Sequence, residues 1–338
     1  MATITEYIEP LLRGENLTFE QAVNVLDAIF EGQVAEPQIA AFLTAMRCKP
    51  VTAAELAGLA KSLRVHSVKI EVGIDNLVDT CGTGGAAVKT FNISTAAALV
   101  AAGAGVHIAK HGNRGITSKC GSADVLAELG VNIEAGPDIV ARCIRQAGIG
   151  FMFAPKYHPA MKYVQPVRKA LGFRTVFNFL GPLANPAGAQ AQIMGIADED
   201  LMPVVAEALN LLGVSRAMIV HSNGLDEIST MEPTEITELK AGKLTKWTLK
   251  PADYGLKSTT LDLLAGGDAK HNADIVKNIL KGKDNGPRKD IVVLNAAAAI
   301  IVGGLANDFA SAVGIAGQSI ESGSGLHRLE KLVMISNS

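Results

Sequence analysis

The sequence predicts an α/β protein with a small N-terminal helical domain and a larger α/β domain, whose mostly parallel central sheet carries helices on both sides. Up to about residue 70, apolar residues recur at helical spacing behind capping signals. From about residue 75, short apolar runs end in glycine-rich turns and alternate with helical segments, which is typical of parallel β-α units. We expect residues 1–70 to form the helical domain, joined by helices from about 158–190. Residues 75–157 and 191–338 should form the α/β domain.

The N-terminal segment carries the clearest helix signals. Thr18 and Gln21 form a capping pair ahead of an apolar stripe that ends before Gly32. A second stripe follows Pro37, and Thr52 with Glu55 predicts the cap of a further helix. So small a bundle cannot bury all its faces alone, so we expect it to pack on the rest of the chain or on a second copy.

The α/β segment contains five units in which an apolar run leads into a polar or glycine-rich turn. They read NLVDTCGTGG, GVHIAKHGN, GIGFMFAPK, AQIMGIADED and RAMIVHSNG. One exception is the stretch 234–250, where two alternating segments flank Ala241-Gly242-Lys243 and predict a hairpin. In a parallel sheet, ligands bind at the carboxyl ends of the strands, so the turns are the candidate sites.

The composition limits the possible partners and compartments. The 338 residues have 48% hydrophobic content and a net charge of -2, which argues against a nucleic-acid partner. The four cysteines, Cys48, Cys81, Cys120 and Cys143, form no CxxC pair and favour free thiols in a reducing cytosol. The N-terminus lacks a signal peptide pattern, and the apolar run 291–306 is shorter than the ~20 residues of a membrane span. We expect a cytoplasmic protein without a membrane partner, with that run as a buried helix.

The turn from Cys81 to Thr95, CGTGGAAVKTFNIST, is the first candidate anion site. Its glycines alone could simply make a tight strand-to-helix connection. The dense set of Thr90, Asn92, Ser94 and Thr95 favours contacts to an anionic oxygen cluster at a helix start. The segment has no G-K-[ST], so an ordinary ATP P-loop is disfavoured.

Two further turns complete a candidate phosphate and metal site. The stretch 109–124 presents Lys110, His111, Arg114 and Lys119 among glycines, and we interpret it as a second anion grip rather than a solvated charge run. Asp226 and Glu227 follow another strand; opposite two phosphate-binding turns, adjacent carboxylates suit a hydrated magnesium ion. Ser94 could supply a further oxygen ligand.

The stretch 157–187 supplies candidate groups for a carboxylate substrate. Helical phasing turns Met161, Val164 and Val167 inward, which leaves Arg168 and Arg174 to hold a carboxylate bidentately. His158 before Pro159 could equally be a helix-entry residue or a ligand contact.

Taken together, these motifs closely resemble the anthranilate phosphoribosyltransferase family of tryptophan biosynthesis, over nearly the whole chain. The most specific stretches are GTGG with TFNIST, KHGNR, SKCGSADVLAELG, HPAMKYVQPVRKALGFRTVFNFLGPLANP and LDE. The resemblance implies transfer of the phosphoribosyl group of 5-phosphoribosyl 1-diphosphate (PRPP) to the amine of anthranilate, with release of diphosphate. It also implies magnesium as cofactor and a homodimer through the helical domain.

The resemblance implies the following site residues. Anthranilate would contact Gly82, Asn113 and Arg168; Mg²⁺ would be held by Ser94, Asp226 and Glu227; and Lys110, Asn113 and Arg168 would serve catalysis. The donor would be held by Gly82, Gly85, Ala86, Thr90, Asn92, Ile93, Ser94, Thr95, Lys110, His111, Gly112, Asn113, Arg114, Gly115, Ile116, Thr117, Ser118 and Ser122.

The chain departs from the family pattern at Ala86-Ala87, where the family usually has Asp-Gly. An acid beside the diphosphate site is thus missing, and we expect magnesium dependence to differ from that of typical members. Three alternatives stay open: a phosphoribosyltransferase for another aromatic amine acid, a pyrimidine nucleoside phosphorylase-like enzyme, and a non-catalytic relative that binds nucleic acid.

Overall fold

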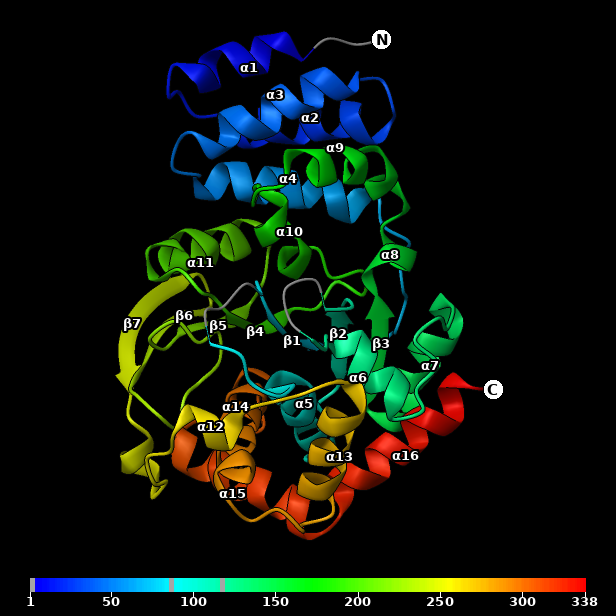
Figure 1. Cartoon of the computed structure of the whole chain (residues 1–338), viewed down its shortest axis with the longest axis vertical. Helices are drawn as coiled ribbons and strands as arrows, with labels where there is room; N and C mark the ends of the chain where they lie inside the picture. Colours follow the sequence, from blue (N-terminus) through cyan, green and yellow to red (C-terminus); the bar gives the residue numbers. More distant parts are fainter. Residues whose placement is uncertain (1–3, 85–87, 116–118) are drawn as a thin grey trace.

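Two of the four N-terminal helices, α2 (Phe19–Phe30) and α4 (Ala53–Val65), begin at the capping signals of the sequence. Thr18 and Gln21 form a capping box, as do Thr52 and Glu55. In this computed structural model, which describes residues 4–84, 88–115 and 119–338, the four helices stack as one layer at the top of the molecule (Figure 1). They are α1 (Thr5–Leu12), α2 (Phe19–Phe30), α3 (Glu36–Arg47) and α4 (Ala53–Val65).

The sheet confirms the five predicted parallel strands and the hairpin. Its order is β3-β2-β1-β4-β5-β6-β7, with β1 to β5 parallel and β6 and β7 antiparallel. The hairpin turn consists of Ala241 and Gly242, both at positive φ, while Lys243 already belongs to the second strand. The strands are β1 (Val78–Gly82), β2 (Ile108–Gly112), β3 (Ile149–Phe153), β4 (Ala191–Gly195), β5 (Arg216–His221), β6 (Thr234–Lys240) and β7 (Lys243–Leu249).

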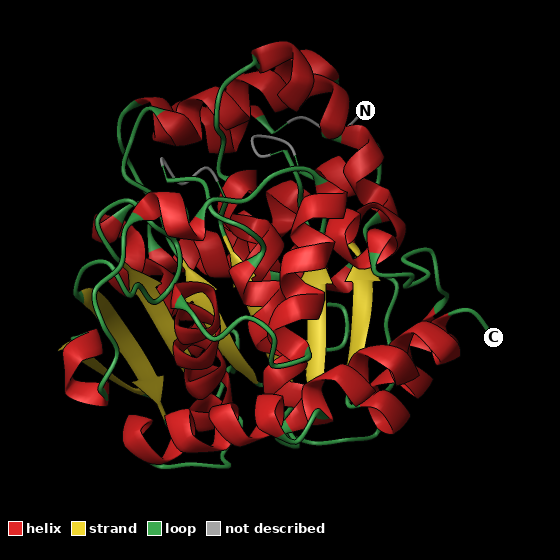
Figure 2. Ribbon diagram, turned by 60° about the horizontal axis from the view of Figure 1, so that its bottom comes forward, coloured by secondary structure: helices red, strands yellow, loops and turns green. Residues whose placement is uncertain are grey.

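Helices cover both faces of the sheet, as predicted (Figures 1 and 2). On the face toward the N-terminal helices lie η1 (Pro159–Tyr163), α9 (Gln165–Leu171), α10 (Phe177–Leu183), η2 (Glu199–Leu201) and α11 (Met202–Leu211). The other described helices are α5 (Ile93–Gly103), α6 (Ser122–Glu128), α7 (Pro137–Ala147), α8 (Ala154–Tyr157), η3 (Pro251–Tyr254), α12 (Leu261–Leu264), α13 (Ala269–Leu280), α14 (Pro287–Val302), α15 (Phe309–Glu321) and α16 (Ser324–Ser336).

Alternation along the central strands sorts their side chains into separate cores. Ile193 of β4 and Met218 of β5 pack with α5 and α14, whereas their neighbours Met194 and Ile219 pack with α11 and the N-terminal helices. Side chains of η1, α9 and α10 belong to this second core. On this packing we propose that the segment 159–183 forms part of the helical domain.

The apolar run that begins at Ile291 forms the buried helix α14. All twelve residues from Ile291 to Val302 are buried, and the helix stops before Gly303. Over the described residues, no helix combines the length and the apolar character that crossing a bilayer requires.

Candidate active site

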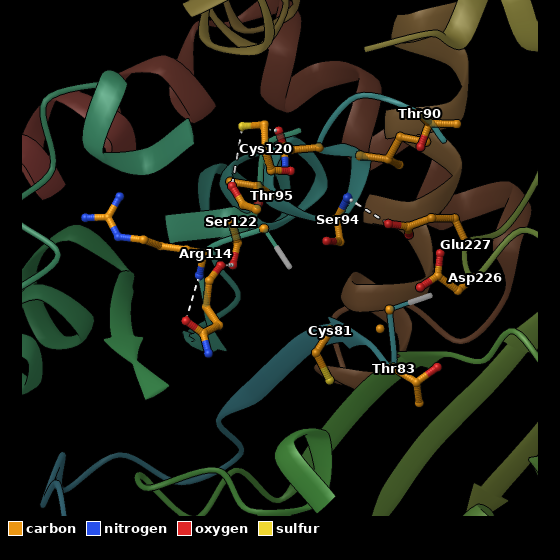
Figure 3. Close-up of a pocket in the computed structure, with 18 of the residues that line it drawn as sticks. Cys81, Thr83, Thr90, Ser94, Thr95, Arg114, Cys120, Ser122, Asp226 and Glu227 are labelled. Carbon is orange, nitrogen blue, oxygen red and sulfur yellow. Dashed lines mark hydrogen bonds between the residues drawn. The ribbon is translucent and has the colours of Figure 1, made fainter. Parts of the chain in front are cut away.

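A cavity of about 380 Å³ lies at the carboxyl ends of the parallel strands, where ligands bind in sheets of this kind. Figure 3 shows Ser94 and Thr95 of α5 facing the cavity, with Asp226 and Glu227 on one side and Arg114 and Ser122 on the other. We name it the donor cavity. Its lining includes these members of the predicted donor and metal sets: Gly82, Thr90, Asn92, Ile93, Ser94, Thr95, Lys110, His111, Gly112, Asn113, Arg114, Gly115, Ser122, Asp226 and Glu227.

Five predicted donor residues, Gly85, Ala86, Ile116, Thr117 and Ser118, lie outside the described residues, as does Ala87. The expected effect of Ala86-Ala87 on magnesium use therefore stays a prediction.

The loop that carries Asp226 and Glu227 packs closely against the backbone at the ends of β1 and β4. A Cβ at Gly82 would lie 2.6 Å from Asp226 Oδ2, and one at Gly195 would lie 1.7 Å from the Asp226 carbonyl oxygen. Only glycine leaves room for the acidic loop at the ends of β1 and β4. The Ser94 backbone N–H donates to Glu227 Oε1 at 3.1 Å, which ties the loop to the start of α5 (Figure 3).

Burial and mutual repulsion destabilise the charged forms of Asp226 and Glu227, and a bound cation would relieve this. Burial raises the pKa of Asp226, and burial together with the neighbouring Asp226 charge raises the pKa of Glu227. Two adjacent carboxylates of this kind gain from a divalent ion. Among the described residues, no three His, Cys, Asp or Glu side chains form a preformed metal cage. Mg²⁺ commonly takes only one or two protein carboxylates and completes its shell with water and phosphate, so Asp226, Glu227 and Ser94 fit this ion.

Asn295 on α14 orients the acidic loop, although none of the sequence motifs includes it. Its Nδ2 donates to the Ile228 carbonyl oxygen at 2.8 Å, and its Oδ1 accepts from the Ile228 backbone N–H at 3.0 Å. This two-point clamp fixes the backbone directly after Glu227. An asparagine within a long apolar helix pattern was the signal that could have found it.

Lys110 lies in the sheet rather than on an exposed basic loop. Its side chain is 2% exposed, and its Nζ donates to the Thr80 carbonyl oxygen at 2.5 Å and approaches Ser94 Oγ at 3.5 Å. Burial lowers its pKa, while Asp79 and Glu227 oppose this shift. The Lys110 side chain therefore lies beside Ser94, a predicted metal ligand, and its charge offsets those of the buried Asp79 and Glu227.

Asp79 is a second residue that sequence reasoning missed. It is fully buried in β1, where burial raises its pKa to about 6. Asn185 Nδ2 donates at 2.8 Å both to Asp79 Oδ2 and to the Ala109 carbonyl oxygen. The His111 backbone N–H donates to Asp79 Oδ1 at 3.2 Å. Asp79 and Asn185 thus fix β2 at the point where it delivers Lys110 and His111.

The loop after β2 closes around Asp124, so the predicted basic cluster is not a single exposed patch. Arg114 Nη1 donates to Asp124 at 2.9 Å, and the backbone N–H groups of Gly115 and Gly121 donate to the same carboxylate. Ser122 Oγ donates to the Asn113 carbonyl oxygen at 3.4 Å. In the described part of this loop, Arg114, Gly115, Gly121 and Ser122 are therefore held by hydrogen bonds within the loop, which lines the donor cavity as a folded turn around Asp124.

A second cavity, of about 500 Å³, adjoins the first and lies between the helical layer and the strand ends. We name it the acceptor cavity. Met161 lines it instead of lying wholly in the core, and Arg168 stands over the Phe177 ring at 5.4 Å while donating to Gln165 at 3.4 Å. Arg174 lies elsewhere, at the edge of the donor cavity. Both cavities are lined by Cys81, Gly82, Thr83, His111, Gly112, Asn113 and Asn178.

His158 directly precedes η1, as a helix-entry residue does, and it also contacts His111 and lines the acceptor cavity, so a role in ligand binding stays a prediction. His111 Nδ1 lies 3.2 Å from the Gly181 carbonyl oxygen and must donate, since a carbonyl only accepts. His158 Nε2–H then donates to His111 Nε2 at 3.2 Å. Burial lowers the pKa of His111 to about 4 and that of His158 to about 3, so the pair is neutral at physiological pH.

The histidine pair predicts a loss of stability in acid. Both pKa values lie below the unfolded value near 6.5, so the unfolded state takes up more protons as pH falls from about 6.5 to about 4. Relative to His158→Gln, the wild type should lose about 2 kcal/mol more between pH 7.5 and pH 5, measured by urea unfolding. The raised pKa of Asp79 increases the free energy of unfolding as the pH falls. Because both proteins contain Asp79, this effect cancels in the comparison. Exposed His327→Gln is the control, and equal losses in all three proteins would contradict the prediction.

The family models that match the chain identify its helical part and its α/β part as the two domains of a glycosyl transferase. The profile described as "Glycosyl transferase family, helical bundle domain" matches residues 5–67, and "Glycosyl transferase family, a/b domain" matches residues 74–326. The curated anthranilate phosphoribosyltransferase of Desulfatibacillum aliphaticivorans is 47% identical over 330 residues, with 97% of each chain covered. The chain belongs to the anthranilate phosphoribosyltransferase family.

Solved structures agree with this assignment. The crystal structure of anthranilate phosphoribosyltransferase from Thermus thermophilus superposes with a TM-score of 0.93 at 39% identity, covering 98% of this chain and 99% of that one. The Saccharomyces cerevisiae enzyme in complex with PRPP and Mg has a TM-score of 0.88 at 29% identity, covering 98% and 97%. The same yeast enzyme has also been solved with 4-fluoroanthranilate, with a TM-score of 0.87.

Proposed function

We propose that this chain transfers the phosphoribosyl group of PRPP to the amine of anthranilate in tryptophan synthesis, with PRPP in the donor cavity and anthranilate in the acceptor cavity. The observation that carries the proposal is the shared wall at Gly82 and Asn113, where the two cavities meet. The wall is where an anomeric carbon from one side and an amine from the other could come together. The relatives bind PRPP, Mg and an anthranilate analogue, which supports the assignment.

On the donor side, the chain offers the amino end of α5 and hydroxyl groups to the diphosphate. Ser94, Thr95 and Ser122 line the cavity, and the Thr95 hydroxyl is buried with no protein partner among the described residues. Helix starts and hydroxyls of this kind bind phosphate oxygens. When bound through Asp226, Glu227 and Ser94, Mg²⁺ supplies positive charge where negative charge grows on the departing diphosphate. Lys110 offsets the negative charge of Glu227 and Asp79, so that they repel the departing diphosphate less.

On the acceptor side, Arg168 would hold the anthranilate carboxylate and thereby aim the amine. The amine lone pair forms the new bond to the anomeric carbon while the bond from that carbon to the diphosphate oxygen breaks, and the nitrogen then loses one proton to solvent or to the released diphosphate. An arylamine is a weak nucleophile, so alignment contributes more than base strength, and no covalent intermediate with the protein is needed. The apolar walls at Leu63, Met161 and Phe177 exclude water that would hydrolyse the donor.

The experiment is a fluorescence assay with the purified full-length chain. Mixing it with anthranilate, PRPP and Mg²⁺ should abolish anthranilate fluorescence, and a chelator should prevent the loss. Binding of PRPP without loss of fluorescence would overturn the proposed acceptor. In that case, other aromatic amine acids in the same assay would test whether the chain is a phosphoribosyltransferase for a different acceptor.

We further propose that two copies of the chain associate through the helical domain. Leu12 on α1 is 62% exposed, and an apolar side chain of this size gains from being covered by a second copy.

A further inference from the structure

A third cavity, of about 500 Å³, lies between the helical layer and the strand ends and belongs to neither substrate cavity. The turn between α3 and α4, the start of α10 and the segment after β4 enclose it. We name it the interdomain cavity. It is lined by Met46, Arg47, Lys49, Pro50, Val51, Thr83, Arg174, Thr175, Val176, Phe179, Ala197, Asp198 and Leu201.

Two hydroxyl groups on its wall are buried without a partner. Thr175 is 2% exposed, and neither its Oγ1 nor that of Thr83 has a hydrogen-bond partner among the described residues. A buried hydroxyl left unpaired costs free energy, so folded proteins rarely keep one without a compensating ligand or water. These two hydroxyls are therefore positions in the cavity where a water molecule or a polar ligand atom can form a hydrogen bond.

The charges around the cavity favour an anion. Arg47 and Arg174 make no ion pair with any described carboxylate. The Arg174 side chain donates to the Gly84 carbonyl oxygen at 3.2 Å. Lys49 Nζ already forms an ion pair with Glu55 Oε2 at 2.7 Å. Asp198 is the sole carboxylate in the described lining, and it caps η2 by accepting from the Asp200 backbone N–H.

We propose that the interdomain cavity binds a small aromatic carboxylate that regulates donor binding. The guanidinium groups of Arg47 and Arg174 can hold a carboxylate, and the Thr175 hydroxyl can donate to it. Most of the remaining lining is apolar, including Met46, Phe179 and Leu201, which suits a ring rather than a free inorganic anion.

Three contacts link this cavity to the substrate cavities. Arg174 lines the donor cavity as well and holds Gly84, while Thr83 lines all three cavities. The Thr175 backbone N–H donates to Asn178 Oδ1 at 3.0 Å, and Asn178 lies in the wall that donor and acceptor cavities share. A ligand that binds Arg174 therefore alters its hydrogen bond to Gly84, which lines the donor cavity, and so changes the affinity for PRPP.

The test is calorimetric titration of the full-length protein with 2-naphthoate. The wild type should show two binding events, because the acceptor cavity also takes an aromatic carboxylate. Arg168→Gln should remove one event. Arg47→Ala and Thr175→Val should each lower the affinity of the second binding event at least tenfold, consistent with loss of a charged or buried hydrogen bond. This binding readout does not depend on turnover, so it stands apart from the assay of the proposed function.

Controls and kinetics separate binding in this cavity from general damage. Thr44→Val, at an exposed threonine of α3, and Arg13→Ala, at an exposed arginine, should leave both events intact. Thr175→Val should melt at the same or a higher temperature, since it removes an unpaired buried hydroxyl. Added 2-naphthoate should change the KM for PRPP at least twofold in the wild type but not in Arg47→Ala. A single event that Arg168→Gln abolishes, or a second event that survives both cavity variants, would overturn the proposal.

Discussion

Replacing Asp226 with Asn is expected to lower kcat/KM by about 10²- to 10³-fold and to raise the Mg²⁺ concentration for half-maximal rate by more than about tenfold. The reason is electrostatic. Asp226 is one of two adjacent carboxylates with raised pKa values, and its loss removes half of the negative charge that a cation would meet at the donor cavity. Steady-state kinetics over a magnesium titration measure both effects.

Stability separates this loss of function from misfolding. Asn has nearly the same shape as Asp but carries no buried charge, so the variant without Mg²⁺ should melt at the same or a higher temperature. Glu232→Gln, an exposed acid-to-amide change a few residues further along, is the matched control and should retain wild-type kinetics. A normal magnesium titration for Asp226→Asn would remove this residue from the proposed metal site.

Replacing Arg168 with Gln should raise the KM for anthranilate by about 10- to 100-fold, equivalent to the 1.5–3 kcal/mol of a hydrogen bond to a charged group. The KM for PRPP should change by less than about twofold, since Arg168 lines the acceptor cavity and not the donor cavity. The guanidinium is held over Phe177 and can offer two parallel donors to one carboxylate.

Arg168→Lys should restore part of the lost affinity, because an ammonium keeps the charge but not the fork geometry. Lys169→Gln removes a charge from the adjacent, exposed position and serves as the control. If Arg168→Gln raised both KM values equally, Arg168 would have a structural role in the helical domain rather than a role in binding anthranilate.

Local sequence signals determined the elements well. The capping boxes at Thr18 and Thr52 are present, the five apolar runs are the five parallel strands, and the hairpin turns at Ala241-Gly242. These features depend on contacts within a few residues and on period-2 or period-3.6 patterns, which a sequence displays directly. The motifs also indicated the family, because the residues of the glycine-rich turns and of the acidic pair are near neighbours in the sequence and form patterns that the sequence displays directly.

The tertiary structure decided how these parts act together. Only the fold shows that Lys110 is buried and interacts with the charges of Asp79 and Glu227, or that His158 forms a hydrogen bond with a histidine 47 residues away. Asn295, placed in the sequence as an interruption of an apolar helix, proves to clamp the acidic loop. Such roles depend on which partners lie across the packed layers, and pairings between distant residues leave no periodic pattern in a single sequence. The sequence by itself therefore determined the elements, the turns and the class of chemistry. Packing between layers decided the charge balance, the shared wall of the two substrate cavities and the separate interdomain cavity.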